Sequence, residues 1–241
     1  NSGKRRESFL LILGSLFLIG LGLAGSWYGY QEFLRRTAPP AVTTPVNQFI
    51  SPQERIELNV TGALRNELLS SIASTADTVS EGELAHLVLK VETASTTALM
   101  TSAQFFKLIE GQAMGSFVRS LESLFMMGSL GQSRFLIFKL SSFENAFAGM
   151  LNWEKNMASD LGPIFQTASL LKTIGPTNVF KDTILKNKDV RVLSAPTSPG
   201  ATTTQPVLVY TFFGNTTLII TDNLETLQTL IDRLTQALLV H

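Results

Sequence analysis

The chain has 241 residues, and its 19 basic and 19 acidic side chains give no formal net charge. Without a basic stripe to match a phosphate backbone, a nucleic-acid partner is not expected. The chain has no cysteine and only two histidines, which excludes disulfides, thiolate metal sites and zinc sites built on several histidines, so no metal or other cofactor is expected.

The first predicted element is a membrane helix. Residues 9–27, FLLILGSLFLIGLGLAGSW, carry no charge, and a helix of that length rises about 28 Å, close to the thickness of a hydrocarbon core. We predict a transmembrane helix over 9–30, with residues 1–8 (which include Lys4, Arg5 and Arg6) as a cytoplasmic stub and the rest extracytoplasmic. The alternative is a signal peptide cleaved near Ala24-Gly25-Ser26.

Small residues recur along one side of this predicted helix. Gly22 and Ser26, and likewise Gly25 and Gly29, are four residues apart, a spacing that allows another helix to approach closely. These four residues are the predicted membrane-helix packing site. The alternative is that glycine is simply common in membrane helices.

A proline-rich spacer is predicted next. Residues 37–52, TAPPAVTTPVNQFISP, contain four prolines and read as an extended linker that carries an extracytoplasmic domain over 53–241. A second stretch of this composition, 194–206, lies between two strand patterns and is predicted to be a hairpin loop.

The domain alternates strand and helix patterns. Strands are predicted at 55–60, 83–92 and 187–194, helices at 63–74 and 101–111, and hairpins that turn near 128–133 and at 214–215. The fold class expected from this order is α+β, an antiparallel or mixed sheet with helices packed on one face. His86 lies in the alternating segment 83–92 and is predicted to be a strand-surface histidine.

Two parts of the domain follow the same order of elements. An offset of 81 residues places FLIFKLSSFE over TTLIITDNLE, so that each hairpin runs directly into a helix. Ser141 with Glu144, and Asp222 with Glu225, have the spacing of a capping box. We predict repeats over 83–161 and 187–238, and the alternative is two unrelated units of a common type.

Glu154 is the candidate site residue. In the helix predicted over 141–163 it points within about 20° of the centre of the apolar stripe. A carboxylate there needs a partner, because burial of an unpaired charge costs several kcal/mol, and Arg119, Arg134 and Lys139 are the candidates. The hypotheses are a paired structural glutamate, or a general acid with Glu144 or Asp160 as second carboxylate.

Three stretches carry a resemblance to a known family: AFAGMLNWEKNMASDLGPIF (146–165), FKDTILKNKDVRVL (180–193) and NTTLIITDNLETLQTLIDRL (215–234). They resemble an uncharacterised family of single-pass membrane proteins from candidate-phyla bacteria of the Patescibacteria type. The resemblance implies a bacterial cell-envelope protein. It implies no activity, and no catalytic residues follow from it.

Three functions are compatible with these patterns. The first is a membrane-anchored, non-enzymatic envelope protein whose domain binds a protein partner or a second copy of itself. The second is a module that binds glycan or a small ligand, with Trp153 and Glu154 as candidate binding residues. The third is an envelope hydrolase with Glu154 as the catalytic carboxylate. Because no catalytic motif accompanies Glu154, the first function is the expectation.

Overall fold

The fold is described from a computed structural model. It describes residues 2–37, 47–92, 96–165, 168–171, 174, 179–198 and 201–239. The chain divides into two compact units, Asn1–Thr44 and Pro45–His241, and each is described by itself. Most of the predicted spacer, 38–46, lies outside the described residues.

The first unit contains one long helix, α1 (Ser2–Thr37). The predicted membrane segment 9–27 lies within it, although residues 9–12 and 15–17 are outside the part whose side chains are described. Over the described residues, no helix combines the length and the hydropathy that a membrane span requires.

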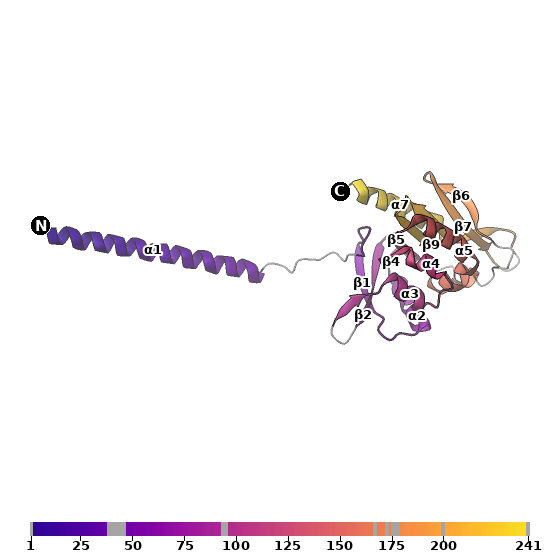
Figure 1. The fold of residues 1–241 in the computed structure, drawn as a ribbon, viewed down its shortest axis with the longest axis horizontal. Helices are drawn as coiled ribbons and strands as arrows, with labels where there is room; N and C mark the ends of the chain where they lie inside the picture. The colour runs from indigo at the N-terminus through magenta and orange to yellow at the C-terminus, as the bar shows by residue number, and fades with distance from the viewer. Residues whose placement is uncertain are drawn as a thin grey trace. The chain divides into compact units, whose positions relative to one another are not determined.

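The second unit is built on a mixed sheet, which confirms the predicted α+β class (Figure 1). Within the described residues the sheet has nine strands in the order β1-β2-β4-β5-β9-β8-β7-β6, and β3 pairs with β2. The β1–β2 pair is parallel and the other pairs are antiparallel. The strands are β1 (Glu54–Asn59), β2 (Leu84–Glu92), β3 (Thr97–Leu99), β4 (Leu121–Leu130), β5 (Ser133–Leu140), β6 (Lys181–Leu185), β7 (Lys188–Pro196), β8 (Thr204–Phe213) and β9 (Thr217–Thr221).

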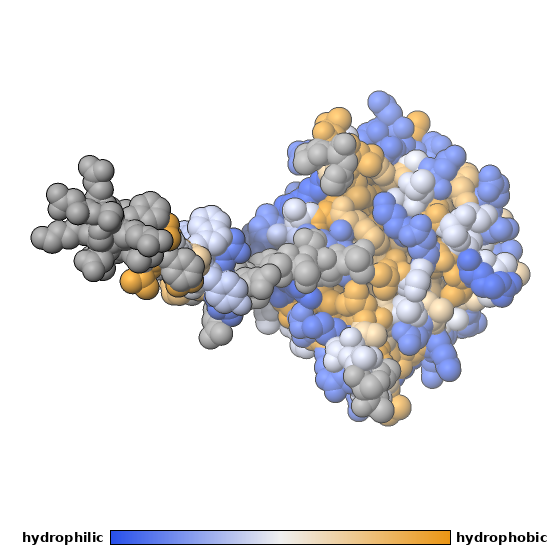
Figure 2. All heavy atoms as spheres, turned by 60° about the vertical axis from the view of Figure 1, so that its left-hand side comes forward, coloured by the Kyte–Doolittle hydropathy of each residue, from blue (hydrophilic) through white to orange (hydrophobic). Residues whose placement is uncertain are grey.

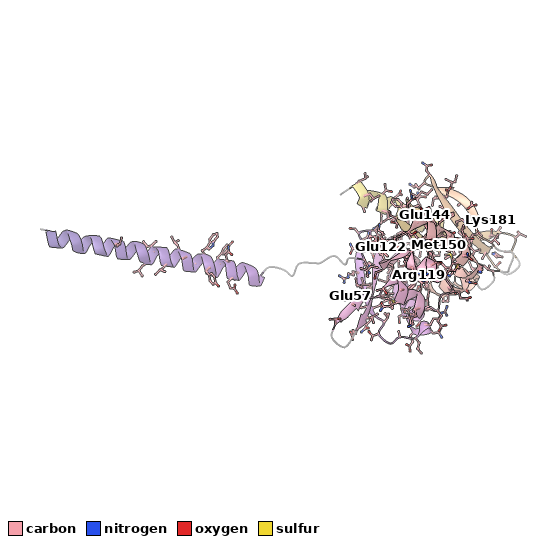
Figure 3. All side chains as sticks on the ribbon, viewed as in Figure 1. Glu57, Arg119, Glu122, Glu144, Met150 and Lys181 are labelled. Atoms are coloured by element: carbon pink, nitrogen blue, oxygen red, sulfur yellow. The ribbon has the colours of Figure 1, made fainter. Side chains whose placement is uncertain are left out.

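The distribution of apolar and polar residues along each strand accounts for its central or edge position in this sheet. The central strands read as nearly continuous apolar runs, as expected when both faces of a strand are covered. The edge strands are more polar: Glu57 of β1 and Lys181 of β6 are both exposed, and in Figure 3 they mark opposite sides of the domain. Charged side chains on edge strands discourage pairing with other chains.

One face of the sheet, here called the helical face, carries most of the helices. Leu136, Phe138 and Tyr210 point to this face and belong to its core. The helices that cover this face are α2 (Arg65–Ala76), α3 (Ser102–Leu108), α4 (Gly115–Arg119), α5 (Phe143–Leu161), η1 (Gly162–Ile164) and α6 (Ala168–Leu171). Thr101 caps α3, because its side chain accepts a hydrogen bond from the Gln104 amide.

The opposite face is covered by α7 (Leu224–Leu239) and by residues 47–53. Leu227, Leu230 and Ile231 of α7 pack there with Phe135, Ile137, Val209 and Ile219. The prediction that helices pack on one face only was therefore wrong. The apolar run of β5 needs cover on both faces, and the amphipathic α7 supplies the second cover.

The two predicted hairpin–helix units are present as β4-β5-α5 and β8-β9-α7. Phe138 and Ile219, which the 81-residue offset aligns, point to opposite faces, and each faces the helix of its own unit. The capping box predicted for Ser141 and Glu144 does not form, and the one predicted for Asp222 and Glu225 stays a prediction. Ser142 precedes α5 without a side-chain cap, and Asn223 caps α7 by accepting the Thr226 amide at 2.8 Å. A common origin of the two units stays a prediction.

One strand was missed by the sequence analysis. Residues 181–185 form β6, which is joined to β7 by a turn at Lys186 and Asn187. Both turn residues have positive φ, 53° and 57°, as a two-residue type I′ hairpin requires. Asparagine tolerates positive φ, so Asn187 in the KNK sequence was the available sequence signal for a hairpin turn.

Candidate functional site

Glu154 lies on the side of α5 that faces the sheet, and it is held by a pair of hydrogen bonds from Arg191 of β7. Arg191 Nε donates to Oε1 and Nη2 donates to Oε2, both at 2.7 Å. The side chains are 15% and 24% exposed for Glu154 and Arg191 respectively, so the pair is largely removed from water. A bidentate pair of this kind is among the stronger charge-assisted contacts in proteins.

Two further residues complete this cluster. The Tyr210 hydroxyl of β8 donates to Glu154 Oε1 at 2.7 Å, and Arg191 Nη1 donates to the Asp182 carboxylate of β6 at 2.8 Å. Asp182, Arg191 and Tyr210 are direct neighbours across β6, β7 and β8. Sheet register therefore aligns the three side chains beneath α5.

The cluster changes the acidity of its members. Hydrogen bonds to Glu154, and then to Asp182, raise the pKa of Arg191 above its usual value. Burial raises the pKa of Tyr210 well above its ordinary range, and the hydrogen bond to Glu154 adds to this shift. The two shifts favour a cationic arginine and a neutral tyrosine.

The prediction that Glu154 has a charged partner is confirmed, but the three candidate partners were wrong. Arg134 pairs with Asp77 at 2.5 Å, and Lys139 donates to Thr217 at 3.0 Å. Arg119 is exposed at the end of α4. Arg191 was missed because the position of β7 beneath α5 depends on the order of strands in the sheet, which the sequence analysis did not predict.

This geometry favours the structural role for Glu154. Both of its oxygens are engaged by the Arg191 guanidinium, and Oε1 also accepts from Tyr210. A general acid must reach a substrate oxygen, and the bonds from Arg191 and Tyr210 already occupy both carboxylate oxygens of Glu154. Neither proposed second carboxylate joins the cluster: Glu144 is exposed, and Asp160 binds elsewhere.

Trp153, the residue before Glu154 on α5, is buried. Its side chain is only 1% exposed and packs against Phe106 and Phe117, with ring centroids 5.2 and 5.6 Å away. The indole N–H donates to Asp160 Oδ2 at 2.6 Å, and the Gln112 amide donates to the same oxygen at 2.7 Å. Trp153 therefore presents no exposed ring to a glycan, and the candidate binding role for it is not supported.

His86 is fully buried in β2, so its prediction as a strand-surface histidine was wrong. Strand β2 is covered on both faces from Leu84 to Leu89. Neither ring nitrogen of His86 has a hydrogen-bond partner among the described residues. Burial, with a smaller contribution from the charge of Arg55, lowers the pKa of His86 to about 4.

A groove lies between residues 48–53 and α7. It has a volume of about 750 Å³, which is within the range of ligand-binding clefts. Its lining includes Phe49, Ile50, Asp232, Arg233, Gln236 and Ala237. The sequence analysis missed this groove because residues 48–52 were assigned to the spacer, whereas Asn47 and Ile50 are buried in the domain.

The last turn of α7 leaves apolar side chains exposed beside the groove. Leu227, Leu230, Ile231 and Leu234 are buried, but Leu238 is 67% exposed and Leu239 81%. Figure 2 brings forward the side of the domain where β1 and the end of α7 lie in Figure 1, and apolar atoms form a band across it. The apolar stripe of α7 thus continues beyond the sheet that covers its first turns.

The remaining predicted residues lie on α1. A Cβ placed on Gly22, Gly25 or Gly29 would meet no atom within 4 Å, and Ser26 is exposed. Their role in helix packing stays a prediction. In the part of the chain that the structure describes, no three His, Cys, Asp or Glu side chains are grouped to hold a metal ion.

Comparisons with protein-family models, with curated proteins and with solved structures find no match to the chain. The resemblance to a family of bacterial membrane proteins therefore stays a prediction.

Proposed function

We propose that this protein is a membrane-anchored, non-enzymatic component of the cell envelope whose α+β domain binds a protein partner. The observation that carries the proposal is the exposed end of α7. Leu238 extends the apolar stripe past the sheet, Leu239 is exposed next to it on the last turn, and both adjoin a groove that contains Phe49, Ile50 and Ala237. Exposed apolar surface next to a groove is typical of protein-interaction sites.

The anchor in this proposal rests on the sequence. Residues 9–27 carry no charge, and basic residues precede them, so the domain is proposed to lie outside the cytoplasm. The binding role rests on the second unit alone. Glu154, the strongest catalytic candidate in the sequence, is engaged by Arg191 and Tyr210, which favours a scaffold over a hydrolase.

The test is a mass measurement on the full chain extracted from native membranes in mild detergent. The unaltered protein is expected in a particle well above its own 26.3 kDa plus micelle. The variant Leu238→Ser with Leu239→Ser is expected to release the protein from that particle, because it removes the apolar contact. Leu64→Ser is the matched control, since Leu64 is 69% exposed but lies on the helical side.

The proposal fails if the unaltered protein is extracted as a lone chain. It also fails if the Leu238/Leu239 variant and the Leu64 variant leave the particle equally intact.

A further inference from the structure

We infer that the groove between residues 48–53 and α7 receives an acidic segment of the protein partner, with a carboxylate on Arg233 and an apolar side chain against Phe49. This inference rests on the proposed protein-binding function, and it adds the chemistry of the partner.

Arg233 carries a charge that no carboxylate of the described residues neutralises. Its Nη1 donates to the Ser51 carbonyl at 3.1 Å and to Gln53 Oε1 at 3.3 Å, and both acceptors are neutral. A guanidinium has five N–H donors on three nitrogens. Within the described part of the chain, the other two nitrogens make no hydrogen bond, so Arg233 retains donors for an anionic ligand.

The neighbouring charges do not cancel that of Arg233. Asp232 also lines the groove, but its carboxylate pairs with Lys186 at 3.2 Å. Lys139 is not part of the groove lining but lies over Phe49, with its ammonium 5.3 Å from the ring centroid, and it bonds only the Thr217 hydroxyl among the described side chains. Two cations therefore lack a carboxylate partner near the groove, and this charge complements an acidic ligand.

The apolar residues of the groove lining indicate that the ligand also carries an apolar side chain. Phe49 is half-buried, Ile50 is buried, and Ala237 continues the groove toward exposed Leu238. An apolar side chain that enters here would bury surface on both partners. The polar residues Gln48 and Gln236 can bond a peptide backbone, since each amide offers donors and an acceptor, whereas the Gln53 oxygen already accepts from Leu84 and Arg233.

A protein segment fits this site better than a lipid surface. Arg233 lies inside a concave groove and is bonded to residues 51 and 53 of its opposite wall. A bilayer surface is broad and contacts projecting residues, whereas a groove of about 750 Å³ admits a short stretch of chain.

The experiment measures binding of three short fluorescein-labelled peptides to the full chain in detergent micelles by fluorescence anisotropy. The peptides share the same apolar residues and carry Glu, Gln or Lys at the other positions. The Glu peptide is expected to bind the unaltered protein about 5-fold more tightly than the Gln peptide, and the Lys peptide most weakly. Arg233→Gln is expected to abolish the advantage of Glu over Gln.

Two further variants control for folding and for general charge. Arg119→Gln removes an exposed arginine from the helical side and should retain the full preference for Glu. Gln236→Glu places a carboxylate one helical turn from Arg233, where it competes with the carboxylate of the ligand, so it should weaken the Glu peptide several-fold and strengthen the Lys peptide.

The inference is overturned if the unaltered protein does not prefer Glu, if the preference survives Arg233→Gln, or if none of the peptides binds. Binding of phosphatidylglycerol vesicles that depends on Arg233, without binding of any peptide, would overturn it in favour of a lipid. If Leu238→Ser weakens all three peptides equally and no preference for Glu exists, the acidic partner is wrong but the proposed function stands. If the Glu preference depends on Arg233 while the native particle ignores the Leu238/Leu239 change, the proposed α7 surface is wrong.

Discussion

Glu154 of α5 and Arg191 of β7 are 37 residues apart in the chain and form two hydrogen bonds of 2.7 Å each. The pair fastens the longest helix of the domain to the strands at one end of the sheet. Tyr210 and Asp182 extend it on either side. The following predictions test this pair and the other buried polar residues.

Glu154→Gln should destabilise the domain by about 2–3 kcal/mol. The change leaves the Arg191 guanidinium without its main anion, and only Asp182, whose side chain is 80% exposed, remains beside it. Chemical unfolding of the full chain in micelles, followed by circular dichroism, measures the loss. Glu144→Gln is the control on the same helix, because Glu144 is exposed, and it should cost less than 0.5 kcal/mol. Equal stability of the two variants would show that the pair contributes nothing.

Asp160→Ala should cost about 2–4 kcal/mol and shift the fluorescence of Trp153. The change removes the acceptor of the buried Trp153 indole N–H and of the Gln112 amide. The emission is measured in a Trp27→Phe background so that one indole reports. Asn152→Ala, at an exposed position of the same helix, should leave both stability and emission nearly unchanged. An unaltered emission in the Asp160 variant contradicts the assigned contact.

Gly149→Ala should destabilise the domain by about 1–3 kcal/mol, although alanine is the better helix former by 0.5–1 kcal/mol. An added Cβ would lie 2.4 Å from Cβ of Phe117, which is fully buried in α4. Asn152→Ala, at an exposed position of α5, tests helix propensity alone and should be neutral or slightly stabilising. A Gly149 variant that melts at or above the temperature of the unaltered protein would refute the close packing of α4 on α5.

Acid should weaken the fold through His86. Its pKa is about 4 in the folded protein and 6.5 when unperturbed, so the unfolded chain takes up this proton first as the pH falls. The free energy of unfolding should therefore decrease as the pH falls from 6.5 to 4, by up to about 3 kcal/mol. Above pH 6.5 His86 is neutral in both states, so it should cause no change of stability with pH. Arg55 and Glu57 of β1 are the charged neighbours across from β2.

The measurement compares unfolding free energies at pH 4.5 and pH 7 for the unaltered protein and for His86→Leu. The leucine variant should lose less stability than the unaltered protein on acidification, because its residue 86 does not titrate. An identical pH dependence of the two proteins would show that His86 is not buried in its neutral form.

Local sequence patterns were enough to predict the fold class and most elements of the domain. Alternation in 83–92 and amphipathic periodicity in 141–163 predicted β2 and α5, because these patterns depend only on local geometry and on burial of apolar side chains. The same reasoning showed that Glu154 needs a charged partner, since a carboxylate near an apolar stripe is costly when unpaired.

The identity of that partner could not be predicted from local patterns, because it depends on contacts between distant segments. Strands β9 and β8 lie between β5 and β7, so α5, which follows β5, reaches Arg191 through the strand order and not through proximity in the chain. Burial of His86 and Asp160 was equally hidden: β2 is covered on both faces, and α5 packs against α4 as well as the sheet. A periodic pattern reports how many sides of an element avoid water, but the identity of what covers them depends on contacts between distant segments.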